Sequence, residues 1–274
     1  MLLESPGRIF VGPDGHGGML SALVRSGALQ DMRRRGLQQV FYGQIDNPLL
    51  QVCDPLLIGS HIAARSELTT QVVRKRDPLE RVGNVVAVDG RVQVIEYSDL
   101  PESAARQTNP DGSLKLWAGN LAVHVFDVPF LARVADQPGA LPFHVARKKV
   151  PCIDELGRPM EPAAPNALRF ERFIFDLLPA AENALVVEAD PTEAFAPVKN
   201  SDSEATDNPS TARRAMVQQA QRRLSEAGVE VRPEVAVEIN PLWALDAEEI
   251  RSKWQPGTVV DRPTYFSPDG PVER

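Results

Sequence analysis

The fold is decided early in the chain, by a stretch that reads Ile9-Phe10-Val11-Gly12-Pro13-Asp14-Gly15-His16-Gly17-Gly18. Its three apolar residues predict a short strand, and the glycines and proline that follow predict a shaped loop. Apolar residues then recur at helical spacing from Met19 to Met32, interrupted by Gly27, until Gly36 ends the pattern. A glycine-rich loop before a helix can approach an anion closely through its backbone N–H groups, but it is also a common connector.

The next apolar run, Val40–Ile45, predicts a buried strand that leads directly into Asp46, Asn47 and Pro48. A loop, a helix and a strand in this order predict a βαβ element of an α/β fold. Ligands of such folds bind beyond the carboxyl ends of the strands. Asp46 is therefore a candidate ligand of a magnesium ion (Mg2+), which prefers carboxylate and phosphate oxygens. The alternative is that Asp46 only caps a turn.

Two further polar residues follow predicted strands. Two predicted strands, Asn84–Val88 and Arg91–Tyr97, are joined by Asp89-Gly90, which favours a hairpin. The end of the second strand carries Glu96. A strand at Leu114–Trp117 ends in Ala118, Gly119 and Asn120. A carboxylate and an amide can sort sugar hydroxyls and an acetamido group, yet both can equally satisfy local backbone groups.

The rest of the chain alternates helical and strand patterns. Helices are expected at Pro129–Ala135, Ala167–Leu178, Pro209–Ala227 and Asp246–Trp254, and strands at Ala184–Ala189, Val229–Val231 and Val235–Ile239. The polar stretch at residues 200–210 predicts an exposed connection. We therefore expect residues 1–205 to form one domain and residues 206–274 a small C-terminal α+β region.

Composition narrows the class of protein. A chain of 274 residues, 43% of them hydrophobic, can bury a substantial core, and a net charge of -7 disfavours binding to nucleic acids or to membrane surfaces. The two cysteines, Cys53 and Cys152, suit neither a disulfide framework nor a zinc site, which favours a reducing compartment. The chain starts without a signal-like segment and contains no apolar run of membrane-spanning length, so we expect a cytoplasmic protein.

The remaining polar residues divide into weak and stronger candidates. The four histidines show no metal-ligand spacing, and His124 is expected to be a hydrogen-bonded core residue. Arg169 and Lys199 lie beside apolar residues in segments that should pack, where a cation needs a partner such as phosphate.

Several of these segments together resemble the UDP-sugar pyrophosphorylase family, most closely its eukaryotic-type UDP-N-acetylglucosamine branch. The similar segments lie in the same order and at similar spacing: residues 12–18, 45–49, 54–59, 80–83, 94–98, 118–120, 165–176, 195–200 and 207–213. The resemblance covers residues 8 to about 215. It implies a Rossmann-related, GT-A-like nucleotidyltransferase domain, of which the first strands are missing here.

The resemblance also implies a reaction. UTP and a sugar 1-phosphate, most closely N-acetylglucosamine 1-phosphate, would give a UDP-sugar and pyrophosphate by in-line attack on the α-phosphorus, with magnesium neutralising charge. Carried over by position, Asp46 would bind the metal and the α-phosphate, Lys199 the UDP phosphates, and Arg169 a phosphate. Residues expected to bind the uridine and sugar are Gly15, His16, Gly83, Glu96, Tyr97, Asn120, Phe173 and Phe175.

Three departures from the family pattern bear on activity. His16 stands where the N-acetylglucosamine enzymes usually have asparagine, and Arg169 where they have lysine, so the sugar preference is open. The glycine-rich loop that holds the triphosphate in the family has no counterpart in these residues. We therefore expect the chain by itself to be inactive or nearly so. The alternatives are a non-catalytic sugar-nucleotide-binding protein and one half of a split enzyme.

Overall fold

The computed structural model describes residues 2–137, 139–255 and 257–273. The chain divides into two compact units, described here separately. The first, the sheet unit, comprises residues up to Tyr42 together with Cys53–Glu188. The second, the C-terminal unit, comprises Gly43–Val52 and the chain from Ala189 onward. This division differs from the expected boundary between residues 205 and 206.

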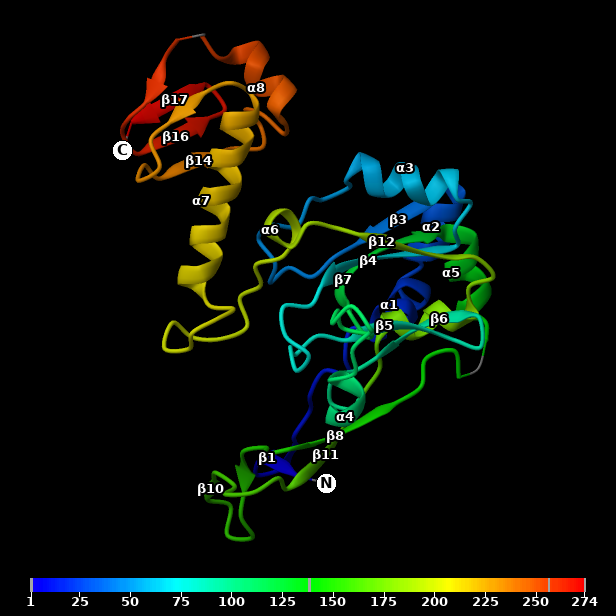
Figure 1. Ribbon diagram of the computed structural model, residues 1–274. Coiled ribbons are helices and arrows are strands. Elements are labelled where there is room, and N and C mark those ends of the chain that lie inside the picture. The colour runs from blue at the N-terminus through cyan, green and yellow to red at the C-terminus, as the bar shows by residue number, and fades with distance from the viewer. Residues whose placement is uncertain (1, 138, 256, 274) are drawn as a thin grey trace. The chain divides into compact units, whose positions relative to one another are not determined.

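A six-stranded mixed sheet forms the centre of the sheet unit, with strand order β12-β4-β7-β5-β6 and with β3 also paired to β7 (Figure 1). The strands are β3 (Gln39–Tyr42), β4 (Leu68–Arg74), β5 (Asn84–Val88), β6 (Arg91–Ile95), β7 (Ala118–Asp127) and β12 (Ala184–Glu188). β12 runs parallel to β4, whereas β7 runs antiparallel to β3, β4 and β5. The α/β class expected from the sequence is therefore confirmed as a mixed α/β fold.

The predicted βαβ element is wrong. The strand before the glycine-rich loop, β2 (Arg8–Ile9), pairs antiparallel with β1 (Leu3–Ser5) in a separate two-stranded sheet, and β3 joins the central sheet antiparallel to β7. β3 also ends at Tyr42, and Ile45 is fully exposed. β2 therefore forms a local hairpin with β1 in place of the predicted parallel pairing, and β3 pairs with β7.

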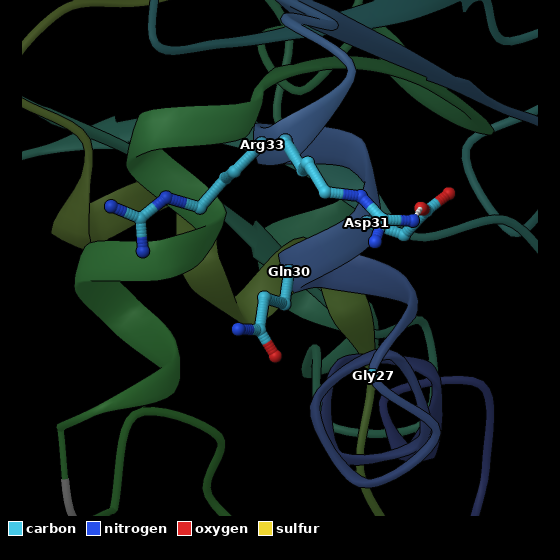
Figure 2. Close-up of a pocket in the computed structure, with 5 residues that line it drawn as sticks. Gly27, Gln30, Asp31 and Arg33 are labelled. Carbon is cyan, nitrogen blue, oxygen red and sulfur yellow. Dashed lines mark hydrogen bonds and ion pairs between the residues drawn. The ribbon is translucent and has the colours of Figure 1, made fainter.

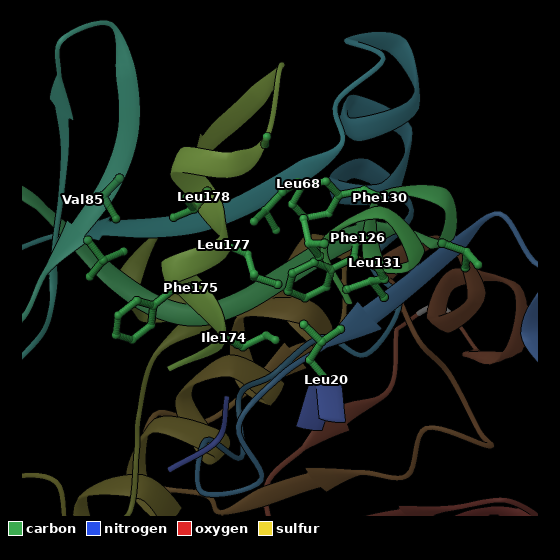
Figure 3. Packing of buried hydrophobic residues seen from close by; sticks show 14 of the residues in the cluster. Leu20, Leu68, Val85, Phe126, Phe130, Leu131, Ile174, Phe175, Leu177 and Leu178 are labelled. Atoms are coloured by element: carbon green, nitrogen blue, oxygen red, sulfur yellow. The ribbon is translucent and has the colours of Figure 1, made fainter. Parts of the chain in front are cut away.

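Helices and the sheet enclose one apolar core in this unit. α1 (Gly18–Arg25), α2 (Ala28–Arg34) and α5 (Val128–Ala135) contribute to it together with the 3-10 helix η1 (Ile174–Ala180). Figure 3 shows its largest side chains, among them Leu20, Leu68, Phe126, Phe130, Leu131, Ile174 and Leu177. Burial of each such side chain stabilises the fold by about 1.5–3 kcal/mol. The predicted helix break is confirmed, because Gly27 is left-handed at φ 76 between α1 and α2.

Of the other elements predicted from the sequence, one hairpin is confirmed and two elements are wrong. The β5–β6 hairpin is confirmed, with positive φ at Asp89 and Gly90 as a type I′ turn requires. The strand expected at Leu114–Trp117 is wrong, since β7 begins only at Ala118. The helix expected at Ala167–Leu178 is also wrong.

That segment forms β11 (Ala167–Glu171), which pairs with β8 (His144–Lys148), and then η1. The exposure of the side chains alternates along β11, because successive side chains of a strand point to opposite faces. The β8–β11 ribbon extends from the sheet to the small strands β9 (Cys152–Ile153) and β10 (Pro159–Met160), and β1 contacts β9 (Figure 1). Two further helices of the unit are α3 (Pro55–Ala63) and α4 (Glu102–Ala105).

The C-terminal unit has its own core. α6 (Pro191–Ala194) precedes α7 (Pro209–Glu226), and α7 packs against a sheet of β14 (Val237–Ile239), β16 (Thr264–Ser267) and β17 (Gly270–Glu273). α8 (Ala247–Lys253) and the pair β13 (Glu230–Val231) and β15 (Val259–Val260) complete it. The predicted end of α7 is confirmed by Gly228 at φ 83. No helix among the described residues is long and apolar enough to cross a membrane.

Candidate functional site

The glycine-rich loop is joined to the segment that leads into η1. The N–H of Gly17 donates to the carbonyl of Arg172 at 2.7 Å, and the N–H of Arg172 donates to the carbonyl of Asp14, also at 2.7 Å. A Cβ atom on Gly15 or Gly17 would overlap the backbone of Arg172. The glycines are thus required for close approach of two chain segments.

This approach brings His16 to an aromatic wall. Its ring lies 5.2 Å from Phe173 and 5.5 Å from Phe175, measured between ring centroids, and those two phenyl rings stack at 5.1 Å. Residues that are far apart in the sequence, all expected to bind the sugar, therefore lie together here. The wall offers an apolar surface beside one polar ring.

The protonation of His16 follows from its contacts. The backbone N–H of Ile174 donates to Nδ1 of His16 at 3.1 Å. An N–H group can only donate, so Nδ1 carries no proton and the neutral ring carries its proton on Nε2. Burial lowers the pKa of His16 to about 4, in agreement with a neutral ring. His16 therefore presents a hydrogen-bond donor, whereas an asparagine amide presents both a donor and an acceptor.

A second group of predicted sugar residues surrounds Gly83. The N–H of Asn120 donates to the carbonyl of Gly83 at 2.8 Å, and a Cβ on Gly83 would lie 2.8 Å from Oε1 of Glu96. Oδ1 of Asn120 accepts from the Thr70 hydroxyl at 3.3 Å and from the N–H of Ala122 at 3.0 Å. The amide Nδ2 of Asn120 is thus the group left to donate to a ligand. Tyr97 follows β6 and is about half exposed.

The sequence pattern predicted Asn120 at the end of a strand, and this prediction is wrong. Asn120 lies inside β7, where the register with β4 shifts: Val72 faces Asn120 but Gln71 faces Val123. Ala122 has a positive φ of 54 in this bulge. Bulges re-aim side chains beside functional sites, and this one is hidden in the sequence because its residues are apolar.

Asp46 and Lys199 belong to the C-terminal unit, unlike all the other predicted site residues. The N–H of Val198 donates to the carbonyl of Asp46 at 2.8 Å, which places the two segments side by side. The buried Asn47 side chain ties them further, donating to the carbonyl of Ala194 at 2.7 Å and accepting from the N–H of Ala196 at 3.0 Å. The sequence pattern alone had not indicated this role of Asn47.

Asp46 suits a magnesium ion as a single ligand. Its backbone carbonyl is hydrogen-bonded, but no described residue pairs with its partly exposed carboxylate. The described residues contain no group of three His, Cys, Asp or Glu that could hold a metal ion. Magnesium commonly uses one or two carboxylates together with waters and substrate phosphates, so the donor set fits that ion.

The two predicted phosphate-binding cations differ in their surroundings. Nη2 of Arg169 lies 3.2 Å from Oε1 of Glu171 and donates to the carbonyl of Pro13 at 3.3 Å. Nε of Arg169 is buried and has no hydrogen-bond partner among the described residues. Lys199 is exposed to solvent, whereas the sequence had suggested that it packs among apolar residues. The phosphate roles of both cations stay predictions from the family resemblance.

His124 is buried as expected, but the expectation of hydrogen bonding is wrong. Neither ring nitrogen has a partner among the described residues. The ring stacks on Tyr42, with 5.6 Å between the ring centroids, and lies edge-on to Phe126, with 5.7 Å between the centroids. Burial, with a smaller effect of His16, lowers the pKa of His124 to about 3.

A surface hollow of ≈ 620 Å³ at α2 does not involve the predicted site. It is lined by Gly27, Gln30, Asp31, Arg33 and Arg34 (Figure 2). None of these residues was predicted to bind a ligand.

Comparison with known proteins identifies the family of this chain. Residues 8–251 match the family described as UTP--glucose-1-phosphate uridylyltransferase. The chain belongs to this family. The resemblance proposed from the sequence is therefore confirmed, and the protein is a nucleotidyltransferase-family member.

Within the UTP--glucose-1-phosphate uridylyltransferase family, curated relatives carry related names. The chain is 38% identical over 248 residues to UDP-N-acetylhexosamine pyrophosphorylase-like protein 1 of Xenopus tropicalis, covering 90% of this chain and 48% of that protein. It is 35% identical over 265 residues to UDP-N-acetylglucosamine pyrophosphorylase of Saccharomyces cerevisiae, covering 95% and 55%. The chain thus spans about half the length of these curated relatives.

A solved structure of a similar protein shows the same fold. The putative UDP-N-acetylglucosamine pyrophosphorylase from Entamoeba histolytica superimposes with a TM-score of 0.84 and 28% identity, over 95% of this chain and 66% of that chain. The uridine diphosphate N-acetylglucosamine pyrophosphorylase from Trypanosoma brucei, solved with an inhibitor, gives 0.78 and 27%, over 92% and 54%. The mixed α/β fold is thus that of UDP-N-acetylglucosamine pyrophosphorylases.

Proposed function

We propose that this chain serves a uridylyltransferase that forms a UDP-sugar and pyrophosphate from UTP and a sugar 1-phosphate, with N-acetylglucosamine 1-phosphate as the preferred substrate. The names of the relatives support this substrate. The observation that carries the proposal is the meeting of His16 with Phe173 and Phe175, because this contact assembles an apolar wall and a polar donor from distant parts of the sequence.

The proposed recognition of the sugar uses residues of the sheet unit. His16 and Asn120 each offer a donor whose partner nitrogen or oxygen is already hydrogen-bonded to the protein. Such donors suit acceptor oxygens, including the carbonyl of an acetamido group. Glu96 would accept from sugar hydroxyls, Gly83 allows that carboxylate to come close, and Gly15 would contact the uridine.

The proposed phosphate chemistry uses residues of the C-terminal unit. Asp46 would hold a magnesium ion, which when bound supplies positive charge to the phosphates that react. Lys199, exposed and without a side-chain partner among the described residues, would bind phosphate oxygens. Arg169 of the sheet unit, whose Nη2 contacts Glu171, would bind phosphate through its other N–H groups. No covalent intermediate with the protein is expected.

The test measures turnover and binding on the same preparation. The chain is incubated with UTP, magnesium and N-acetylglucosamine 1-phosphate while pyrophosphate release is followed, and UDP-N-acetylglucosamine is titrated by calorimetry. Turnover supports the uridylyltransferase and contradicts the expectation that the chain alone is inactive.

Binding without turnover has two explanations, which co-expression separates. If another polypeptide supplies a triphosphate-binding loop, co-expression with such a piece restores turnover, as expected of a split enzyme. If co-expression restores nothing, a non-catalytic sugar-nucleotide-binding protein is favoured. Absence of both turnover and binding in every case contradicts the proposed function.

A further inference from the structure

His144, at the start of β8, contacts the aromatic wall and has no role in the proposed function. Its ring centroid is 4.8 Å from that of Phe173, and the two planes are tilted by 44°. The centroid of the His16 ring is 5.2 Å from that of Phe173. Phe173 therefore contacts two histidine rings, and only one of them is a predicted ligand of the sugar.

His144 is itself held by η1, the helix that follows the wall. Its Nε2 lies 2.9 Å from Oδ2 of Asp176, whose side chain is only 11% exposed. The N–H of Asp176 donates to the carbonyl of Phe173 at 3.1 Å, so the anchor and the phenyl ring belong to one turn of chain. Burial raises the pKa of Asp176, and the hydrogen bond from His144 acts in the opposite direction.

Other acidic groups surround the same ring. Nδ1 of His144 is 3.6 Å from Oδ2 of Asp99, which follows the predicted sugar residues Glu96 and Tyr97. Glu171 faces His144 across the β8–β11 ribbon. The distance to Asp99 is too long for a hydrogen bond, and Asp99 is exposed, so this contact contributes little energy. Asp176 and the ring contact with Phe173 are the main restraints.

We infer that His144 is a positioning residue that holds the phenyl ring of Phe173 against His16. Its ring packs against that of Phe173, and Asp176 fixes the orientation of the His144 ring. Loss of His144 frees Phe173 to move and leaves the enclosed Asp176 carboxylate without its partner. The consequence for sugar binding rests on the proposed function, whereas the positioning of Phe173 does not.

The first test reads the position of Phe173 from its neighbour. The ring of His16 lies 5.2 Å from that of Phe173, close enough for the ring current of Phe173 to influence the NMR frequencies of the His16 C–H protons, which therefore change when the phenyl ring moves. We expect His144→Gln to shift the His16 signals, although the described residues show no ring contact between the two histidines. Unchanged His16 signals in folded His144→Gln overturn the inference.

A second pair of variants covers the case that His144→Gln does not fold. Asp176→Ala removes the anchor of His144 and should shift the His16 signals, whereas Asp176→Asn keeps a hydrogen-bonding partner and should restore them. Equal His16 spectra for Asp176→Ala and Asp176→Asn contradict the inference.

His61 provides a matched control in the same unit. It also pairs with an aspartate, its Nε2 lying 3.1 Å from Oδ1 of Asp127, and its Nδ1 is 2.8 Å from the Thr69 hydroxyl. Its ring has no contact with the aromatic wall among the described residues. His61→Gln should therefore lower the melting temperature, because it also removes a hydrogen-bonded histidine–aspartate pair, but leave the His16 signals in place.

The last measurement relates the positioning to ligand binding. UDP-N-acetylglucosamine is titrated into the unsubstituted chain, His144→Gln and His61→Gln. We expect about tenfold weaker binding for His144→Gln, since displaced binding groups lose affinity, and unchanged binding for His61→Gln. Equal losses in both variants overturn the specific role. If the His16 signals move but no form of the chain binds the sugar nucleotide, the positioning stands and the proposed function fails.

Discussion

The backbone N–H of Val198 donates to the carbonyl of Asp46 at 2.8 Å, and this bond joins two segments separated by about 150 residues of sequence. It aligns the predicted metal ligand with the segment that carries Lys199. Asn47 completes the junction through the backbone of Ala194 and Ala196. These three hydrogen bonds join the segment around Asp46 to the residues of the C-terminal unit before Lys199.

Asn47→Ala should destabilise the C-terminal unit by about 1–3 kcal/mol, because it removes the buried Asn47 amide and leaves the partly buried backbone groups of Ala194 and Ala196 without their partner. Asn200→Ala is the matched control, since Asn200 also donates to a carbonyl, that of Thr206, but is exposed. Its cost should stay below about 0.5 kcal/mol. Chemical unfolding of both variants measures the difference, and equal costs would remove Asn47 from this role.

Asp46→Asn should abolish most of the magnesium-dependent part of UDP binding while leaving the melting temperature unchanged, because an amide is a much poorer magnesium ligand than a carboxylate. Titration of UDP with and without magnesium measures this dependence. Asp54→Asn is the control: Asp54 caps α3 through a bond from the N–H of Leu56, and asparagine caps equally well. A magnesium response that persists in Asp46→Asn rules out the metal role.

Gly17→Ala should lower stability, since its Cβ would lie 2.7 Å from the carbonyl carbon of Arg172. The loop would have to move away from the segment that carries Phe173. Gly59→Ala is the opposite case, because Gly59 lies within α3 with open space around its Cβ position. There the substitution should stabilise the protein by about 0.5–1 kcal/mol. Thermal unfolding should give melting temperatures that change in opposite directions.

Acid should destabilise the sheet unit through two neutral histidines. The pKa values of His16 and His124 are lowered to about 4 and about 3, whereas unfolded histidine has a pKa of 6.5. Between these values the unfolded chain binds more protons than the folded one, so stability falls as the pH drops from about 6.5 toward 4. His124→Phe should reduce this slope and keep the ring stacking on Tyr42. Unfolding free energies measured at several pH values test it, and an unchanged slope contradicts the assignment.

Local chemistry made several elements predictable. The break at Gly27, the turn at Asp89-Gly90 and the end of α7 before Gly228 all depend on positive φ angles that the residue type favours. The motifs of the family also indicated which residues to examine in the candidate site. These features are decided within a few residues of chain.

Strand pairing was not predictable in the same way. β2 found a partner in β1, and the segment 167–171 became a strand because β8 lies beside it. Asn120 was expected at a strand end because the strand was predicted at Leu114–Trp117, whereas β7 begins at Ala118 and has a bulge after Asn120. Each of these outcomes depends on which segment a strand pairs with or on the register of that pairing, which the hydrophobic pattern of one segment does not encode.

The sequence by itself determined the family, the glycine-rich loop before a helix and the identity of the candidate ligands. Only the tertiary structure decided the protonation, the free hydrogen-bonding groups and the orientation of these candidate ligands. Ile174 fixes the proton of His16, Thr70 and Ala122 occupy Oδ1 of Asn120, and Asn47 joins Asp46 to the segment before Lys199. The reason is physical: a side chain's proton, free lone pairs and orientation depend on the groups that surround it in space, and those groups come from distant parts of the chain.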